Sequence, residues 1–597
     1  MKTPVNTQNQ TRRLLFLTFT ALVLGLAMAA VAVLLIHLIE VFTNLFFFGR
    51  LSMQAASPAQ NSLGLAVIAA PVAGGLIVGL MARYGSKAIR GHGIPEAMEQ
   101  ILENKSRIPA RITWLKPLSA AISIGSGGPF GAEGPIIATG GAGGSLLGQL
   151  FSTTAIERKT LLAAGAAAGM SATFNAPVSA VLLAIELLLF EFKPRSFIPV
   201  ALASAVAASA RNWWGMAESV FPVPAFAPVA PGELAFHLLL GAAVGALAVA
   251  ITKSVYFVED HFEKLPIHWM WWPALGAVAI GLVGYFEPKT LGVGYSNITD
   301  ILNTSLPVTA VACLCALKFV SWCIALGSGT SGGTLAPLLT FGSGAGLLIG
   351  SAAAAAFPSL HIQPALAALV GMAALFTGAS QALLASVVFA CETTGQVQAL
   401  LPLLGGCATA LMTARLLAKN SIMSEKIVRR GVSVPSQYEA DVYAHTTVGA
   451  VMETDLTLIP AETPARELLE KIAAHDPEVS RRQAYLLGDG DGNLAGIVTR
   501  GDLVKAAESP DLELSLISLG SDRLVVAYPD ETLHAAIEKL LHHEIGRLPV
   551  VERHAPGRAV GYLSRAAILS ARARLLHEES HRERGWLRLG SKAAAAG

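Results

Sequence analysis

The sequence predicts an all-α protein that crosses a membrane many times, followed by a smaller soluble α/β part. Apolar residues make up 53% of the chain and charged residues only 14%, whereas an ordinary globular chain is about a quarter charged. Residues 1–420 hold 38 of the 84 Asp, Glu, Lys and Arg, and residues 421–597 hold the other 46. This distribution excludes a single soluble domain and a disordered chain. The net charge of +2 excludes a protein that binds nucleic acid through bulk positive charge.

The first membrane helix is predicted at the N-terminal end. Arg12 and Arg13 precede an apolar run from Leu14 to about Phe47. That run is too long for the core of a signal peptide and has no clear small-residue cleavage site. We therefore expect a spanning helix with its basic flank in the cytoplasm.

Further apolar stretches follow, and several are short or interrupted by Gly and Pro. They lie near 63–82, 118–150, 160–190, 196–211, 234–257, 273–285, 305–327, 332–357, 364–378, 381–391 and 396–418. Broken helices are tolerated in a membrane only where they are buried in protein or line a watery cavity. Basic residues cluster at 83–90, 105–116 and 426–430, and the positive-inside rule places these connections in the cytoplasm. We expect a multi-pass protein of the plasma or inner membrane, with both termini cytoplasmic.

An internal repeat relates two halves of the apolar part. A shift of 202 residues places eight Gly, Ser and Pro residues of 125–148 on identical residues of 327–350. A shift of 206 places Gly165 on Gly371 and Glu186 on Glu392. Two halves with Gly- and Pro-interrupted segments at matching positions are typical of transporters whose site lies at the repeat interface.

Three Gly-rich segments, at 91–96, 125–135 and 327–337, carry the chemistry. Each precedes a helix-forming run and has Pro where that helix opens. Helix N-termini offer free N–H groups and partial positive charge, and Gly allows a close approach to the backbone, so the segments predict an anion site. They contain no Lys or Arg, which suits an anion that must leave again. The alternative is that the glycines serve close helix packing.

These segments resemble the signature motifs GSGIPE, GREGP and GGxFxP of the CLC chloride channel and transporter family. The resemblance extends to Asn175-Ala176-Pro177, the helix ending at Glu186 and Glu392-Thr393-Thr394-Gly395. It implies the CLC fold, an inverted repeat of broken and tilted helices, and a homodimer with one anion pathway per subunit. It also implies that Glu133 is the gate, where an ionised carboxylate takes the place of a permeating anion until protonation releases it.

The resemblance implies an anion-binding set and two altered side chains in it. His92 replaces the motif's serine, and its imidazole either donates to the anion, with pH-sensitive binding, or points into the cytoplasmic vestibule. Met423 stands where the family has a tyrosine and lacks a hydroxyl donor. Ala132 replaces the motif's Arg and Leu335 its Phe, which leaves the backbone donors in place. The set comprises Gly91, His92, Gly93, Gly131, Ala132, Gly333, Thr334, Leu335 and Met423.

Proton coupling is the point on which the family divides. Proton-coupled members usually carry Glu-Glu where this chain has Glu186-Leu187, and leucine cannot carry a proton. Glu191 is the nearest substitute, although beside Lys193 and Arg195 it also fits an interfacial acid. Lys318, inside an apolar stretch, has either a structural role or an attractive role for entering anions.

The soluble part resembles a tandem pair of cystathionine-beta-synthase (CBS) domains, at 446–508 and 518–575, followed by a basic tail at 576–597. Residues 484–503 parallel residues 547–567. Thr499 and Asp502 match a family element that holds the ribose of an adenine nucleotide, while Ala567 replaces the Asp of the second copy. The alternative is a purely structural, dimerising module.

We therefore expect residues 1–430 to form a voltage- or pH-gated, passive chloride channel with a glutamate gate, modulated by the CBS pair. The first alternative is a proton/chloride antiporter, and the second is a CBS-regulated cation transporter, which would need intramembrane carboxylates. No catalytic motif and no metal-ligand spacing is present in the apolar part, so neither an enzyme nor a metal site is expected. Chloride or another small anion and the lipid bilayer are the expected partners. No cofactor is expected to be required.

Overall fold

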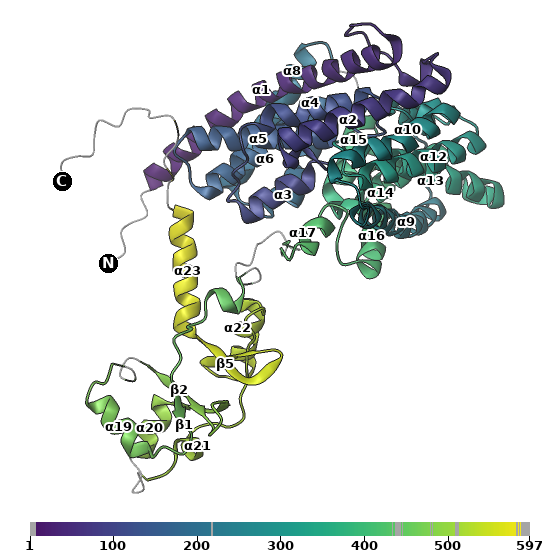
Figure 1. The fold of residues 1–597 in the computed structure, drawn as a ribbon. Coiled ribbons are helices and arrows are strands. Elements are labelled where there is room, and N and C mark those ends of the chain that lie inside the picture. Colours follow the sequence, from purple (N-terminus) through teal and green to yellow (C-terminus); the bar gives the residue numbers. More distant parts are fainter. Residues whose placement is uncertain are drawn as a thin grey trace. The chain divides into compact units, whose positions relative to one another are not determined.

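The computed structural model describes residues 7–580 except 217–218, 433, 436–442, 444–445, 478, 480–481 and 508–512, together with Glu583 and Trp586. They divide into a membrane unit, residues 1–438 with 582–597, and a soluble unit, residues 439–581. Figure 1 draws the fold in sequence colours.

The membrane unit is helical, and its two halves lie side by side as the blue and teal helices of Figure 1. The first half contains α1 (Thr7–Phe48), α2 (Ala69–Tyr84), α3 (Ile94–Glu103), α4 (Ile112–Gly125), α5 (Glu133–Leu150), α6 (Ala155–Phe174), α7 (Pro177–Ala184), the π-helical turn η4 (Ile185–Leu189) and α8 (Pro194–Trp213). The second half contains α9 (Pro231–Glu263), α10 (Trp272–Phe286), α11 (Tyr295–Leu302), α12 (Val308–Gly327), α13 (Leu335–Ala356), α14 (Pro364–Ser380), α15 (Leu383–Thr394), α16 (Leu400–Leu417) and α17 (Glu425–Arg429). Within the described residues, 7 helices are long and apolar enough to cross a membrane.

The apolar stretch near 118–150 is two helices, not one. α4 ends at Gly125 and α5 begins at Glu133, because Gly127 takes a φ of +107° that no helix continues. The same break separates α12 from α13 at Gly329, whose φ is +75°. The two helix ends match in detail, since Ser126 donates to the carbonyl of Ser123 at 3.0 Å and Ser328 to that of Ala325 at 2.7 Å.

Glycines inside the helices allow close packing within each half. A Cβ on Gly140 of α5 would lie 2.1 Å from the carbonyl oxygen of Gly165 on α6, and a Cβ on Gly342 of α13 would lie 2.5 Å from that of Gly371 on α14. These four glycines therefore serve helix packing of the small-residue kind.

Two carboxylates show that the repeat is inverted. Glu392, near the end of α15, accepts hydrogen bonds from the N–H groups of Val178 and Ser179 at the start of α7, at 2.9 and 2.8 Å. Glu186, just after α7, accepts from Leu384 and Ala385 at the start of α15, at 3.0 and 2.9 Å. Since the end of each helix caps the start of the other, α7 and α15 run antiparallel and are related by a local two-fold axis.

The soluble unit contains two small sheets with helices. Its elements are β1 (Leu458–Pro460), α19 (Ala465–Ala473), β2 (Ala484–Gly488), β3 (Leu494–Thr499), α20 (Arg500–Ala507), α21 (Leu516–Leu519), α22 (Leu533–His542), β4 (Arg547–Glu552), β5 (Ala555–Ser564) and α23 (Arg565–Ser580). β2 pairs in parallel with β1 and antiparallel with β3, in register Leu486↔Ile497. β4 and β5 are antiparallel, in register Leu548↔Leu563.

The two similar halves of the soluble unit exchange their leading segments. Val448 and Val451, which precede the first sheet, pack in the core around Leu548 and Leu563. Leu516, which precedes the second sheet, packs in the core around Tyr485 and Val498. Neither half therefore has a complete core of its own.

Candidate functional site

The three Gly-rich loops meet through their main chains. Gly131 and Gly333 form a pair in which each N–H donates to the other's carbonyl, at 3.2 and 3.0 Å. The N–H of Gly91 donates to the carbonyl of Thr330 at 3.1 Å. A Cβ on Gly134 would lie 1.9 Å from the carbonyl oxygen of His92, so only glycine permits the third contact. Loops from both halves of the repeat thus form one site.

Helices α3, α5 and α13 begin at this junction, at Ile94, Glu133 and Leu335. The first-turn N–H groups of a helix have no intrahelical acceptor and carry partial positive charge. The N–H groups of the loop glycines are engaged within the protein, that of Gly93 with Glu96 at 2.7 Å. The N–H groups at the helix starts, rather than those of the loop glycines, are therefore the donors that remain available to an anion.

Glu133 lies at the first position of α5 and is completely buried. Its carboxylate folds back along the loop, since a Cβ on Gly131 would lie 1.6 Å from Glu133 Oε2. Oε1 accepts a hydrogen bond from the Tyr295 hydroxyl at 3.0 Å, and Oε2 has no hydrogen-bond partner. The N–H groups of Glu133 and Ala336 also act on the carboxylate, and a buried carboxylate that neutral donors hold can be displaced.

Tyr295 is the functional residue that the motifs did not indicate. It opens α11 directly after Gly294, whose φ is +74°. Its distance from Glu133 along the chain is 162 residues. The sequence signal at this position is the Gly292-Val293-Gly294 run. It indicates a turn but does not predict that Tyr295 contacts Glu133.

Buried polar atoms without partners gather at the loops. His92 Nδ1, Glu133 Oε2 and Thr334 Oγ1 are buried and make no hydrogen bond. Buried polar groups in folded proteins are normally paired, so such a cluster marks a place where a polar species binds or passes. The cluster takes one residue from each of the three loops, for which an anion site remains a prediction.

His92 and Met423 are both buried, at 6% and 0% exposure. Met423 lies in a turn whose Ile422 donates to the carbonyl of Ala379 at 2.9 Å. Lys426, three residues later, pairs with Glu96 of α3 at 3.5 Å, which ties this turn to the first loop. Met423 brings no donor to the pathway, and the nearby Tyr256 hydroxyl is engaged with the carbonyl of Ile422 at 2.8 Å.

The intramembrane lysine has a symmetric counterpart. Lys318 donates to the carbonyls of Thr290 and Gly292 at 3.2 and 3.3 Å. Lys116, which the 202-residue shift places on Lys318, donates to the carbonyls of Ile89 and Gly91, both at 2.8 Å. Each lysine thus holds a loop in its own half. For Lys318 these contacts favour the structural role over the attraction of entering anions.

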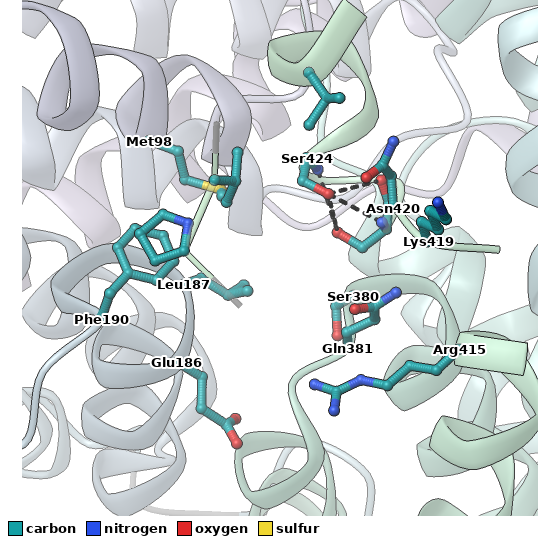
Figure 2. Close-up of a pocket in the computed structure, with 14 residues that line it drawn as sticks. Met98, Glu186, Leu187, Phe190, Ser380, Gln381, Arg415, Lys419, Asn420 and Ser424 are labelled. Carbon is teal, nitrogen blue, oxygen red and sulfur yellow. Dashed lines mark hydrogen bonds between the residues drawn. The ribbon is translucent and has the colours of Figure 1, made fainter. Parts of the chain in front are cut away.

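Leu187 lines a cavity of about 150 Å³. Figure 2 shows Met98, Phe190 and Leu187 on one wall and Ser424, Asn420 and Lys419 on the other. Glu186 also lines it, but its carboxylate caps α15. Glu191 does not line this cavity. It accepts from Ser196 at 2.6 Å and lies 3.2 Å from Lys193.

In the soluble unit, Thr499 and Asp502 bind each other. The Thr499 hydroxyl donates to Asp502 Oδ2 at 2.6 Å, and the N–H of Asp502 approaches the Thr499 hydroxyl at 3.3 Å, which caps α20. A separate cavity of about 520 Å³ lies between the two halves of the soluble unit. The first half contributes Glu453, Asp455 and Arg482 to its wall, and the second half contributes Arg547, Ser564 and Arg565. Among the described residues, no group of three or more His, Cys, Asp or Glu is placed to hold a metal ion.

Comparisons with known proteins agree with this architecture. A family profile described as voltage gated chloride channel matches residues 74–415, and the CBS domain profile matches 448–509 and 518–574. Chloride channel protein CLC-f of Arabidopsis thaliana is 29% identical over 564 residues, which cover 82% of this chain and 70% of the plant protein.

Two further similarities come from a bacterial relative and a solved structure. The H(+)/Cl(−) exchange transporter ClcA of Vibrio campbellii is 30% identical over 362 residues, which cover 59% of this chain and 76% of the relative. A crystal structure of a eukaryotic CLC transporter matches with a TM-score of 0.62 at 19% identity, over 93% of this chain and 98% of that one. These findings confirm the predicted fold class and the resemblance: the chain is a multi-pass membrane protein of the voltage-gated chloride channel (CLC) family, and it carries two CBS domains.

Proposed function

We propose that this protein conducts small anions, chloride first, through the junction of the three loops, with Glu133 as the gate. The observation that carries the proposal is the convergence of the starts of α3, α5 and α13 on a buried carboxylate. Partial charges of helix starts stabilise an anion without the tight hold of a full positive charge. Glu133, at the start of α5, competes for that same stabilisation while it is ionised.

Protonation or displacement opens the gate in this scheme. A protonated Glu133 is attracted less strongly by the starts of α5 and α13, while its hydrogen bond with Tyr295 remains. An arriving anion has the same effect by competition. Voltage acts on the same step, because both the anion and the carboxylate carry charge through the membrane field.

We favour passive conduction over proton exchange. Among the described residues that line the cavity at Leu187, Glu186 is the one with a carboxyl group, and both of its oxygens accept hydrogen bonds from N–H groups at the start of α15. Glu191 is engaged by Ser196 and Lys193. Lys419 and Arg415 line the same cavity and attract anions to this end of the pathway.

Proton-coupled exchange is the second candidate function. It is favoured by one observation, namely that the similar protein from Vibrio campbellii is named as an H(+)/Cl(−) exchange transporter. In that case a proton would need a route other than Leu187. A cation transporter is disfavoured, because the site presents helix N-termini rather than carbonyls or grouped carboxylates.

Ion flux from liposomes tests the proposal. Purified full-length protein is reconstituted with a chloride gradient, a potassium clamp and a pH probe inside the vesicles. We expect chloride efflux without uphill proton movement, and flux through Glu133→Gln that no longer depends on pH. Uphill proton movement driven by chloride would contradict the channel and support the proton/chloride exchanger. If neither a halide nor nitrate crosses the membrane, the proposal is wrong.

For regulation, we place an adenine nucleotide in the soluble cavity lined by Arg482, Arg547 and Arg565. Arginine side chains suit a phosphate chain. A phosphate would compete with Asp455, which lies 3.6 Å from Arg482, and the Ser564 hydroxyl beside them donates to Glu453 at 3.2 Å. Thr499 and Asp502 already satisfy each other, so ribose binding there would have to break this cap.

The working unit is taken as a homodimer with cytoplasmic termini, as the family resemblance implies. Calorimetric titration of the full chain with ATP and AMP tests the nucleotide site.

A further inference from the structure

Arg211 is a buried cation that none of the motifs explains. It lies near the end of α8 with 8% of its surface exposed. Its Nε and Nη1 atoms are buried and have no hydrogen-bond partner. Among the described residues, no carboxylate oxygen lies within salt-bridge distance of it. An uncompensated buried guanidinium is costly, so such a group is normally paired with an anion.

Arg211 lines a cavity of about 520 Å³ that reaches the gate. Ile36, Glu40, Ala132 and Tyr295 line it as well. Tyr295 is the residue whose hydroxyl binds Glu133, and Ala132 directly precedes Glu133. An anion that passes Glu133 on this side therefore traverses the cavity that Arg211 faces.

The cavity lies at the end of the membrane unit opposite the basic starts of α1 and α8. Glu40 belongs to the last turns of α1, whose first turns carry Arg12 and Arg13, and Arg211 belongs to the last turn of α8, which follows Lys193. Glu40 is engaged with His37, with Oε2 3.0 Å from Nδ1. Among the described residues of the cavity wall, the Glu40 carboxylate is therefore bound to His37 and does not lie within salt-bridge distance of Arg211.

We propose that this cavity is a halide site, in which Arg211 binds the permeating anion in front of the Tyr295–Glu133 gate. The proposal deepens the proposed function and rests on it. Ala132 lines this cavity at the motif position where the family resemblance expects an arginine. Among the described lining residues, the full positive charge is instead supplied by Arg211 of α8. A cation in a partly enclosed cavity raises the local concentration of anions.

Bromide serves as the probe, because its anomalous scattering locates it directly. Crystals of the full-length protein grown in bromide should show a peak beside the Arg211 guanidinium, besides any peak at the loops near Thr334. The loop peak reports the proposed function, and the Arg211 peak reports the inference. Bromide at the loops without bromide at Arg211 would overturn the inference alone.

Two substitutions of Arg211 separate charge from packing. Arg211→Gln should abolish the cavity peak and raise the chloride concentration for half-maximal flux roughly ten-fold, as expected for a unit charge acting over a few ångströms. Arg211→Lys should restore most of the affinity. The matched control is Arg50→Gln, which removes an exposed cation near the end of α1 outside the cavity and should change the value less than two-fold.

A variant that leaves the arginine in place covers the case in which Arg211→Gln does not fold. Glu40→Gln removes the negative charge that lines the cavity, so it should lower the chloride concentration for half-maximal flux about three-fold, since one unit of repulsion is lost. An unchanged or raised value, with bromide absent from the cavity, would overturn the inference.

Discussion

At the scale of single residues, the proposed gate includes one phenol that binds Glu133. Tyr295 holds Glu133 Oε1 at 3.0 Å, while Oε2 has no hydrogen-bond partner. A hydrogen bond to a charged group contributes about 1.5–3 kcal/mol. In the proposed gate, Tyr295 therefore contributes to how firmly the ionised carboxylate is held.

Tyr295→Phe should increase chloride flux roughly ten- to hundred-fold, because the closed position of Glu133 loses a donor worth about 1.5–3 kcal/mol and each 1.4 kcal/mol is a factor of about ten. Flux from liposomes measures this. Tyr256→Phe is the matched control, since that hydroxyl binds the carbonyl of Ile422 and does not touch Glu133. The effect of Tyr295→Phe should vanish in a Glu133→Ala background, and an equal effect there would contradict the gate interpretation.

At the scale of elements, the starts of α7 and α15 depend on each other. Each receives two hydrogen bonds from a carboxylate supplied by the end of the other helix, Glu392 for α7 and Glu186 for α15. Charged caps of this kind stabilise helix starts by about 1–2 kcal/mol. The local symmetry predicts equal contributions from the two.

Glu186→Gln and Glu392→Gln should each lower the thermal midpoint of the purified protein by a similar amount, because each weakens one cap by about 1–2 kcal/mol. Glu103→Gln, at an exposed position at the end of α3, is the control and should leave the midpoint unchanged. A large loss for one variant with none for the other would contradict the reciprocal arrangement.

At the scale of the whole molecule, part of the segment after α23 belongs with the membrane unit. Glu583 pairs with Arg158 at 2.8 Å and with Arg107, and its N–H donates to the carbonyl of Thr153 at 3.1 Å. Burial opposes ionisation of this carboxyl, but the hydrogen bonds from Arg107 and Arg158 prevail and lower the pKa of Glu583. Glu583 is thus attached to the membrane unit by ion pairs with Arg107 and with Arg158, which lies in the first turn of α6.

This attachment should depend on pH with a defined sign. Because the pKa of Glu583 is lowered in the attached state, the ion pair contributes fully above the ordinary Glu pKa of about 4.3 and is lost as the pH falls below it. Hydrogen exchange of the N–H groups of Glu583 and Trp586, which donate to the carbonyls of Thr153 and Gln149, should therefore accelerate on acidification and in Glu583→Gln at neutral pH. Glu578→Gln, in the preceding helix, is the control. Equal protection in Glu583→Gln would contradict the ion pair.

The sequence alone predicted the features that depend on local backbone chemistry. The loops, the helix starts at Glu133 and Leu335 and the repeat all follow from Gly and Pro positions. Tyr295, Arg211 and the carbonyl partners of Lys318 could not be predicted, because each depends on which distant segments meet. The exchange of leading segments in the soluble unit was missed for the same reason, since Val448 and Leu516 look like ordinary parts of their own halves.

The reciprocal caps on α7 and α15 have a consequence for biosynthesis. Glu392 follows Ser179 by 213 residues. At about 5–20 residues per second, the start of α7 waits roughly ten to forty seconds for its cap after it leaves the ribosome. The first half therefore enters the bilayer with unsatisfied N–H groups. Until the second half arrives, the unfinished chain relies on water, lipid headgroups or an insertase to cover them.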